Sequence, residues 1–119
     1  PEIQSVLKKT TNLTKKNKKI SVNLAINYGS KDEIINAFKK NKKKISIYNF
    51  EKNLYTSGIP NPDILIRTGG HQRLSNFMLW QLAYSELFFL KKLWPDFNSN
   101  DLTKIVRKYK KSKRNFGAI

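Results

Sequence analysis

A short, wholly apolar run that stops at two glycines constrains the fold of this sequence most. Residues 64–66 are Ile-Leu-Ile, and Arg67-Thr68-Gly69-Gly70 follows directly. A continuous apolar run of this length is typical of a strand that is buried on both faces of a parallel sheet. Open α/β sheets bind their ligands where such strands end. The run therefore predicts an α/β fold, part of a mostly parallel sheet flanked by helices, with a ligand site just after residue 66.

The other elements are predicted from the spacing of apolar residues along the chain. A length of 119 residues is enough for one domain with its own core. Ser30 is expected to cap a helix that runs out in lysines, and Asn100 or Asp101 is expected to cap the last helix. Helices are also expected over residues 2–14, 46–54 and 77–84, and the last helix is expected over 101–112. Strands are expected over residues 20–27, over 64–66 and from Leu87. A turn is expected over residues 94–97.

The net charge of +16 lies almost entirely in the two flanks of the chain. Residues 1–59 carry thirteen lysines against four acids, residues 101–119 carry seven bases against one acid, and residues 60–100 carry four bases against three acids. Single-stranded nucleic acid is usually bound with interleaved aromatic side chains, and the lysine runs contain none. We interpret the flanks as solvated faces and expect no nucleic-acid partner. An anionic membrane surface is the second alternative, and nucleic acid is the third.

Two arginines and a serine surround the glycine turn. Arg67 follows the apolar run, Arg73 follows the glycines, and Ser75 is expected to open the next helix. Two of the four arginines of a lysine-rich chain fall in this loop, where planar bidentate donors would be useful. Together with free helical N–H groups they would make a phosphate or pyrophosphate site. The alternative is a sharp turn whose arginines bond backbone carbonyl groups.

Glu86 and His71 are the other candidates for chemistry in this region. Glu86 is an acid within an apolar stretch, so it is either the partially buried partner of an arginine or a ligand for a hard divalent cation. His71, the sole histidine, is expected to be exposed on its glycine-rich loop, with a catalytic role as the alternative. The chain has no cysteine, which excludes disulfides and thiolate metal sites.

These residues also carry a family resemblance. The sequence resembles the cis-prenyltransferases, and its closest type is the bacterial undecaprenyl pyrophosphate synthases (isoprenyl transferases). The matching segments are Asn27-Tyr28-Gly29, Pro62 to Gly70, Arg73 to Gln81, Tyr84-Ser85-Glu86-Leu87 and Leu93 to Phe97.

The resemblance implies a reaction, a metal and an assembly state. Its members condense isopentenyl pyrophosphate with an allylic pyrophosphate, using Mg²⁺, to make the lipid carrier of cell-wall synthesis. It implies that Arg67, Arg73, Leu74 and Ser75 bind isopentenyl pyrophosphate and that Glu86 binds the magnesium. It also implies a homodimer. We expect the protein to lie in the cytoplasm, in peripheral contact with a membrane, which its basic flanks would favour. We expect the apolar stretch from Phe77 to Trp94 to form the dimer interface, with Trp80, Tyr84, Phe88 and Phe89 divided between core and interface.

The sequence departs from the family pattern at three places. His71 stands where relatives have an acid, and Arg114-Asn115-Phe116-Gly117 replaces an Arg-Arg-Phe-Gly ending. The family's N-terminal Met-Asp-Gly-Asn-Gly-Arg loop, with its metal-binding Asp, has no counterpart. We therefore expect one fragment over residues 1–119, the C-terminal half of the catalytic domain, with no catalytic residue of its own and no activity alone. A non-catalytic partner subunit of a prenyltransferase is the alternative.

Overall fold

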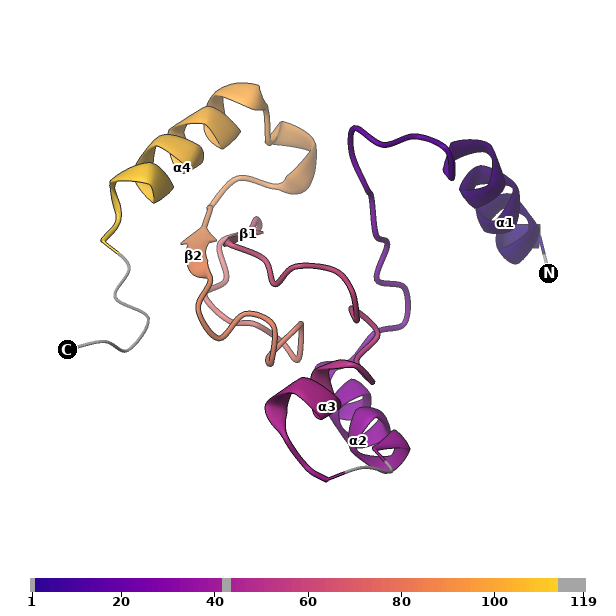
Figure 1. Ribbon diagram of the computed structural model, residues 1–119. Coiled ribbons are helices and arrows are strands. Elements are labelled where there is room, and N and C mark those ends of the chain that lie inside the picture. The colour runs from indigo at the N-terminus through magenta and orange to yellow at the C-terminus, as the bar shows by residue number, and fades with distance from the viewer. Residues whose placement is uncertain (1, 42–43, 114–119) are drawn as a thin grey trace.

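The computed structural model describes residues 2–41 and 44–113 (Figure 1). Arg114 and the three residues after it, which depart from the family's ending, lie outside the described residues. None of the described helices is long and apolar enough to cross a membrane. In chain order the elements are α1 (Glu2–Thr14), α2 (Ser30–Lys40), α3 (Ile47–Glu51), β1 (Ile64–Arg67), β2 (Glu86–Phe89), the 3-10 helix η1 (Trp94–Asp96) and α4 (Ser99–Lys111).

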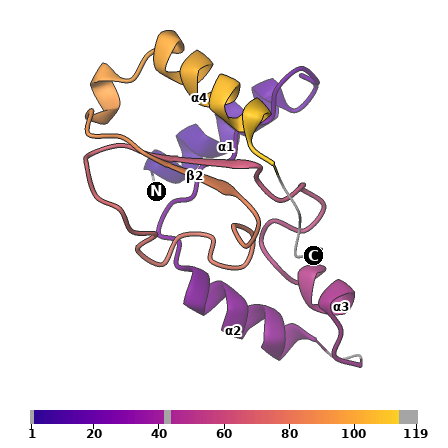
Figure 2. The same cartoon turned by 90° about the vertical axis from the view of Figure 1, so that its left-hand side faces the viewer.

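The two strands form a parallel sheet, as the sequence predicts. Ile64 pairs with Glu86 and Arg67 pairs with Phe89. Figures 1 and 2 show α4 on one side of this sheet and α2 with α3 on the other. The α/β class is therefore confirmed.

The connection between the strands contains no helix, so the helix expected over residues 77–84 is wrong. Ser75, Asn76 and Met78 have φ angles of 49°, 63° and 46°. These left-handed conformations are costly for L-residues and cannot continue a right-handed helix. The segment instead forms a series of turns with Gln81 and Leu82 buried.

Helices α2 and α3 enclose the main apolar cluster. Ala37, Phe50 and Leu54 are buried in it, and Ile34 and Trp80 pack against it. The Phe50 and Trp80 ring centroids lie 4.6 Å apart. Because Trp80 belongs to the strand connection, this cluster fixes the connection against the two helices.

The helix caps lie one to three residues before the predicted ones. Gly29, not Ser30, caps α2. Asn98 caps α4, and its side chain and that of Asp101 form a capping box. On α4, Ile105 is buried, whereas Leu102 is 45% exposed.

Residues 20–27 form no strand, so this prediction is also wrong. The segment joins α1 to α2 as a long separate stretch in Figure 1. A strand requires a hydrogen-bonded neighbour, and within the described ranges no backbone hydrogen bond joins this segment to β1 or β2. The segment therefore has the alternating sequence of a strand but no partner strand among the described residues.

Candidate anion-binding site

The glycine turn folds back along the end of β2. Gly69 and Gly70 have φ angles of 90° and 78°, which glycine adopts without strain. The Gly69 N–H donates to the Lys92 carbonyl oxygen over 2.7 Å, and the Gly70 N–H donates to that of Leu90 over 2.8 Å. A Cβ on Gly69 would meet no atom within 4 Å. The glycines therefore serve the turn, and their amides are already used within the protein.

All four residues predicted to bind substrate line one hollow at the end of β1. Arg67 donates from Nη1 to the Arg73 carbonyl oxygen and, over 3.0 Å, to the Ser75 hydroxyl. The hollow has a volume of about 280 Å³, and its lining combines two guanidinium groups and a hydroxyl with apolar side chains. The lining residues are Leu65, Ile66, Arg67, Arg73, Leu74, Ser75 and Phe77.

Arg67 and Arg73 differ in what their side chains contact. Arg67 is half-buried and bonds a backbone carbonyl, which is the alternative weighed from the sequence. Arg73 is exposed, and its guanidinium has no hydrogen-bond or ion-pair partner in the part of the chain that the structure describes. Arg67 thus fixes the loop, while Arg73 is available to an anion.

Helix α2 holds the segment that carries Ser75. The Ser30 N–H donates to the Asn76 carbonyl oxygen over 2.8 Å, and the Lys31 N–H donates to Asn76 Oδ1 over 2.9 Å. The Ser30 hydroxyl accepts from the Leu79 N–H over 2.9 Å. The first turn of α2 is therefore occupied by Asn76. The expectation that Ser75 opens a helix with free N–H groups is wrong.

A buried carboxylate joins three segments behind this loop. Glu33 is fully buried on α2, and its Oε2 accepts from the Tyr28 hydroxyl and, over 3.1 Å, from Gln81 Nε2. Its Oε1 accepts from the Tyr55 N–H over 2.8 Å. Gln81 Nε2 also donates to the Thr56 hydroxyl over 3.0 Å.

Burial, followed by the hydrogen bond to Glu33, raises the pKa of the Tyr28 hydroxyl. Sequence reasoning missed both Glu33 and Gln81. The available signal was their position: Glu33 lies one helical turn before the buried Ala37, and Gln81 is a polar residue within an apolar stretch.

Glu86 lies apart from the arginines. It is the first residue of β2 and is half-buried, and its register partner Ile64 lies three residues before Arg67. Three residues of strand correspond to about 10 Å. Glu86 forms no ion pair with an arginine within the described ranges. The structure therefore does not bring Glu86 into the hollow with Arg67 and Arg73.

The described residues contain no group of three or more His, Cys, Asp or Glu side chains that could hold a metal. Magnesium requires near-octahedral oxygen ligands, so Glu86 alone does not fit a complete site. His71 is exposed, as expected from its loop.

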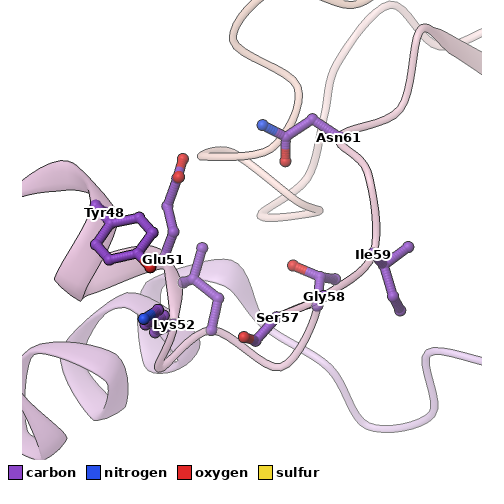
Figure 3. Close-up of a pocket in the computed structure, with 9 residues that line it drawn as sticks. Tyr48, Glu51, Lys52, Ser57, Gly58, Ile59 and Asn61 are labelled. Carbon is purple, nitrogen blue, oxygen red and sulfur yellow. The ribbon is translucent and has the colours of Figure 1, made fainter.

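A second hollow, of about 380 Å³, lies beside α3 (Figure 3). Its charged side chains are already engaged. The Glu51 carboxylate accepts from Trp80 Nε1 over 3.0 Å, and Lys52 Nζ lies 4.0 Å from the centroid of the Tyr48 ring. With no arginine in its lining, it suits an anionic ligand less well than the hollow at Arg73.

Sequence comparisons identify close relatives. Residues 1–117 match the prenyltransferase family model described as undecaprenyl diphosphate synthase. The isoprenyl transferase of Rickettsia prowazekii is 44% identical over an alignment of 119 positions that covers 97% of this chain and 53% of that protein. The isoprenyl transferase of Chlamydia trachomatis is 43% identical over a gapped alignment of 126 positions that covers 98% of this chain and 50% of that protein. The chain spans about half the length of these curated relatives.

Solved structures share the fold. A lavandulyl diphosphate synthase from Lavandula x intermedia, in complex with dimethylallyl diphosphate, matches with a TM-score of 0.91 and 37% identity. The match covers 98% of this chain and 55% of that one. A probable undecaprenyl diphosphate synthase from Campylobacter jejuni matches with a TM-score of 0.85 and 33% identity, over 98% and 56% of the two chains. The chain therefore belongs to the undecaprenyl diphosphate synthase family of prenyltransferases.

Proposed function

We propose that this chain supplies the isopentenyl-pyrophosphate site of a cis-prenyltransferase. The observation that carries the proposal is the hollow at the end of β1, where Arg67, Arg73 and Ser75 lie beside apolar side chains. Such a lining suits a ligand with a multiply charged anionic head and a short hydrocarbon tail. Isopentenyl pyrophosphate has this composition, and the reaction of the family condenses it onto an allylic pyrophosphate.

The residues of the hollow have different roles in the proposal. The Arg73 guanidinium and the Ser75 hydroxyl bind the pyrophosphate oxygens, since guanidinium groups form bidentate bonds to phosphate. Arg67 orients them, because it already bonds the Arg73 carbonyl oxygen and the Ser75 hydroxyl. Leu74 and the neighbouring Leu65 and Phe77 contact the hydrocarbon tail.

In this proposal, residues of this chain and of the rest of the fold would bind the magnesium ion together. Glu86 would contribute one oxygen, and the other ligands would come from the half of the fold that this chain does not span. We infer that the 119 residues alone do not catalyse the condensation. The absence of a metal-binding group among the described residues also favours a second candidate function, that of a non-catalytic partner subunit which binds a complete prenyltransferase.

The remaining parts of the proposal concern assembly and location. The stretch from Phe77 to Trp94 exposes large apolar side chains, including Tyr84, Leu93 and Trp94. Exposed apolar patches commonly mark interfaces, which supports a homodimer through this stretch. We propose that the protein acts in the cytoplasm, in peripheral contact with a membrane, and serves synthesis of the cell-wall lipid carrier.

Calorimetry with isopentenyl pyrophosphate tests the site. Replacing Arg73 by Ala should weaken binding roughly ten- to a hundred-fold, because a hydrogen bond to a charged group contributes about 1.5–3 kcal/mol. Arg107→Ala, on α4, is the matched control and should leave binding unchanged. Equal or tighter binding of single-stranded RNA at about 150 mM salt would contradict the proposal, as would unaltered binding by the Arg73 variant.

A further inference from the structure

Three large apolar side chains at the start of α3 are exposed to solvent. Ile45, Ile47 and Tyr48 are 67%, 68% and 66% exposed, and they lie within four consecutive positions. We call these three residues the apolar tip. Figures 1 and 2 show α3 at the end of the molecule away from α4. Single exposed apolar residues are normal, but a cluster of three at one end of the molecule indicates a contact surface.

Hydrogen bonds hold the apolar tip in place. The Ser46 hydroxyl caps α3 by accepting from the Asn49 N–H over 3.2 Å, and the Ser46 carbonyl oxygen accepts from the Phe50 N–H over 2.9 Å. Asn49 Nδ2 donates to the Lys44 carbonyl oxygen over 2.9 Å. On the inner side, Phe50 is buried in the main apolar cluster. An ordered turn therefore presents the tip, and these polar groups keep their partners when the tip enters an apolar phase.

The apolar tip lies within a lysine-rich part of the chain. Among the described residues between positions 39 and 52, the only acid is Glu51, which is half-buried and accepts from Trp80 Nε1. Lys52 Nζ lies 4.0 Å from the centroid of the Tyr48 ring (Figure 3). The tip thus combines apolar side chains with an excess of positive charge. The exposed lysines of this part are Lys39, Lys40, Lys44 and Lys52.

We propose that the apolar tip docks on an anionic membrane surface. The two isoleucine side chains enter the boundary between head groups and acyl chains, and the tyrosine ring lies at the level of the head groups. The lysines beside them attract the negatively charged lipids. This inference rests on the peripheral membrane contact of the proposed function and names the surface that makes it.

Other occupants and another membrane-binding segment are less suitable. Nucleic-acid bases stack on open aromatic faces, whereas Lys52 already covers one face of the Tyr48 ring. A second copy of this chain brings another +16 charges, which repel. Helix α1 also exposes Ile3 and Val6, but it buries none of its residues. Because nothing buried fixes α1, ordering it on a membrane costs more conformational entropy than binding the preformed tip.

Vesicle binding tests the docking. Flotation of the 119-residue chain with vesicles of phosphatidylglycerol and phosphatidylcholine in equal parts should show binding at least about tenfold tighter than with phosphatidylcholine alone. Ile45→Ser with Ile47→Ser should weaken this binding at least about tenfold, because two apolar side chains no longer leave water. Ile3→Ser with Val6→Ser, on α1, is the matched control and should leave the binding unchanged.

A fluorescent label locates the contact. The chain has no cysteine, so Ile47→Cys can carry a single polarity-sensitive fluorophore. Its emission should move to shorter wavelengths when phosphatidylglycerol vesicles are added, because the label leaves water. The same label on Ile3→Cys should keep its emission.

Charge substitution tests the lysines. Lys44→Gln with Lys52→Gln should weaken vesicle binding roughly ten- to thirty-fold. Lys104→Gln with Lys108→Gln, on α4, removes the same charge and should change it less than about threefold, because distant charges are screened. Arg73→Ala should bind vesicles as the parent chain does, and the Ile45, Ile47 double variant should bind isopentenyl pyrophosphate as the parent does. Failure of docking is therefore distinguishable from failure of the proposed ligand site.

Several results would overturn the proposal. One is equal vesicle binding by the parent chain and the Ile45, Ile47 double variant, or an unmoved emission of Ile47→Cys on bound vesicles. A shift at Ile3→Cys instead would assign the membrane contact to α1. Absence of binding to anionic vesicles by the parent chain would contradict the membrane contact itself and leave the isopentenyl-pyrophosphate site standing. Single-stranded RNA binding that the double variant loses would assign the tip to nucleic acid, and a dimer that it loses would assign the tip to a second copy.

Discussion

The Glu33 carboxylate accepts a hydrogen bond from Gln81 Nε2 over 3.1 Å, although 48 positions separate the two residues. Both side chains are almost completely buried. The contact ties the first turn of α2 to the connection that carries Arg73 and Ser75. Every donor around Glu33, from Tyr28, Tyr55 and Gln81, points at one carboxylate. The network therefore requires a side chain at position 33 whose two terminal atoms both accept hydrogen bonds.

Glu33→Gln should destabilise the chain by about 1–3 kcal/mol, because the new amide N–H₂ would face buried donors and leave one of them unsatisfied. Glu51→Gln is the matched control. Glu51 accepts a single bond, from Trp80 Nε1, which an amide oxygen can also accept, so its effect should stay below about 1 kcal/mol. Urea unfolding of both variants measures the difference. Equal stability of the two would show that the network does not need the carboxylate.

Arg67→Lys should weaken binding of inorganic pyrophosphate by about tenfold or more, although the charge is kept. The Arg67 guanidinium bonds the Arg73 carbonyl oxygen and the Ser75 hydroxyl together. A lysine ammonium lacks the planar fork and leaves this loop less well ordered. Calorimetry measures the affinity, and Arg107→Lys on α4 is the control. An unchanged affinity in the Arg67 variant would mean that loop geometry is set without this side chain.

The stability of the chain should fall as the pH rises above about 10, in part through Tyr28. Burial and the bond to Glu33 raise the pKa of this hydroxyl in the fold. A group with a raised folded pKa contributes its stability fully below its unfolded pKa and loses it as the pH rises toward the folded value. Tyr28→Phe removes this titration, so its stability should fall less steeply with pH.

Urea midpoints between about pH 8 and pH 11 give the slopes for this comparison. Tyr48→Phe is the matched control, because Tyr48 is exposed at the surface, and it should keep the slope of the parent chain. If Tyr28→Phe and the parent chain lose stability in parallel, the phenol of Tyr28 does not contribute to the alkaline transition.

The sequence predicts β1, β2 and the glycine turn well because their signals are local. Ile64-Leu65-Ile66 is apolar on both faces, and Gly69-Gly70 marks the turn at its end. The arginines flank that turn and are only six positions apart, so the sequence already places them near each other. Four of the seven residues that line the hollow could therefore be named from the sequence and its family resemblance, namely Arg67, Arg73, Leu74 and Ser75.

The incorrect predictions, a helix over residues 77–84 and a strand over residues 20–27, have non-local causes. The apolar stretch after Ser75 has helical composition, but contacts of Asn76 with Ser30 and Lys31 hold its backbone in left-handed turns. These partners lie 45 or more positions away, outside any local pattern. Residues 20–27 have the alternation of a strand, but their pairing depends on a neighbour that the described residues do not provide. Glu33 was overlooked because burial of an acid depends on donors from distant segments.

The last prediction concerns catalysis by the 119-residue chain, which should form no prenyl product from farnesyl pyrophosphate and labelled isopentenyl pyrophosphate. The leaving pyrophosphate accumulates negative charge, which a metal held by several oxygen ligands must neutralise. In the proposed function Glu86 would supply one such ligand. Its register partner Ile64 lies three residues, or about 10 Å of strand, before Arg67, and the described residues hold no group of acids that completes a metal site. Raising the magnesium concentration to the millimolar range should not produce activity, since one carboxylate binds the ion weakly.

Thin-layer chromatography of the labelled products tests this prediction, with the complete Rickettsia prowazekii isoprenyl transferase as the active control. A labelled polyprenyl product from the isolated chain that disappears in Glu86→Gln would show that these residues assemble a working metal site without the other half of the fold.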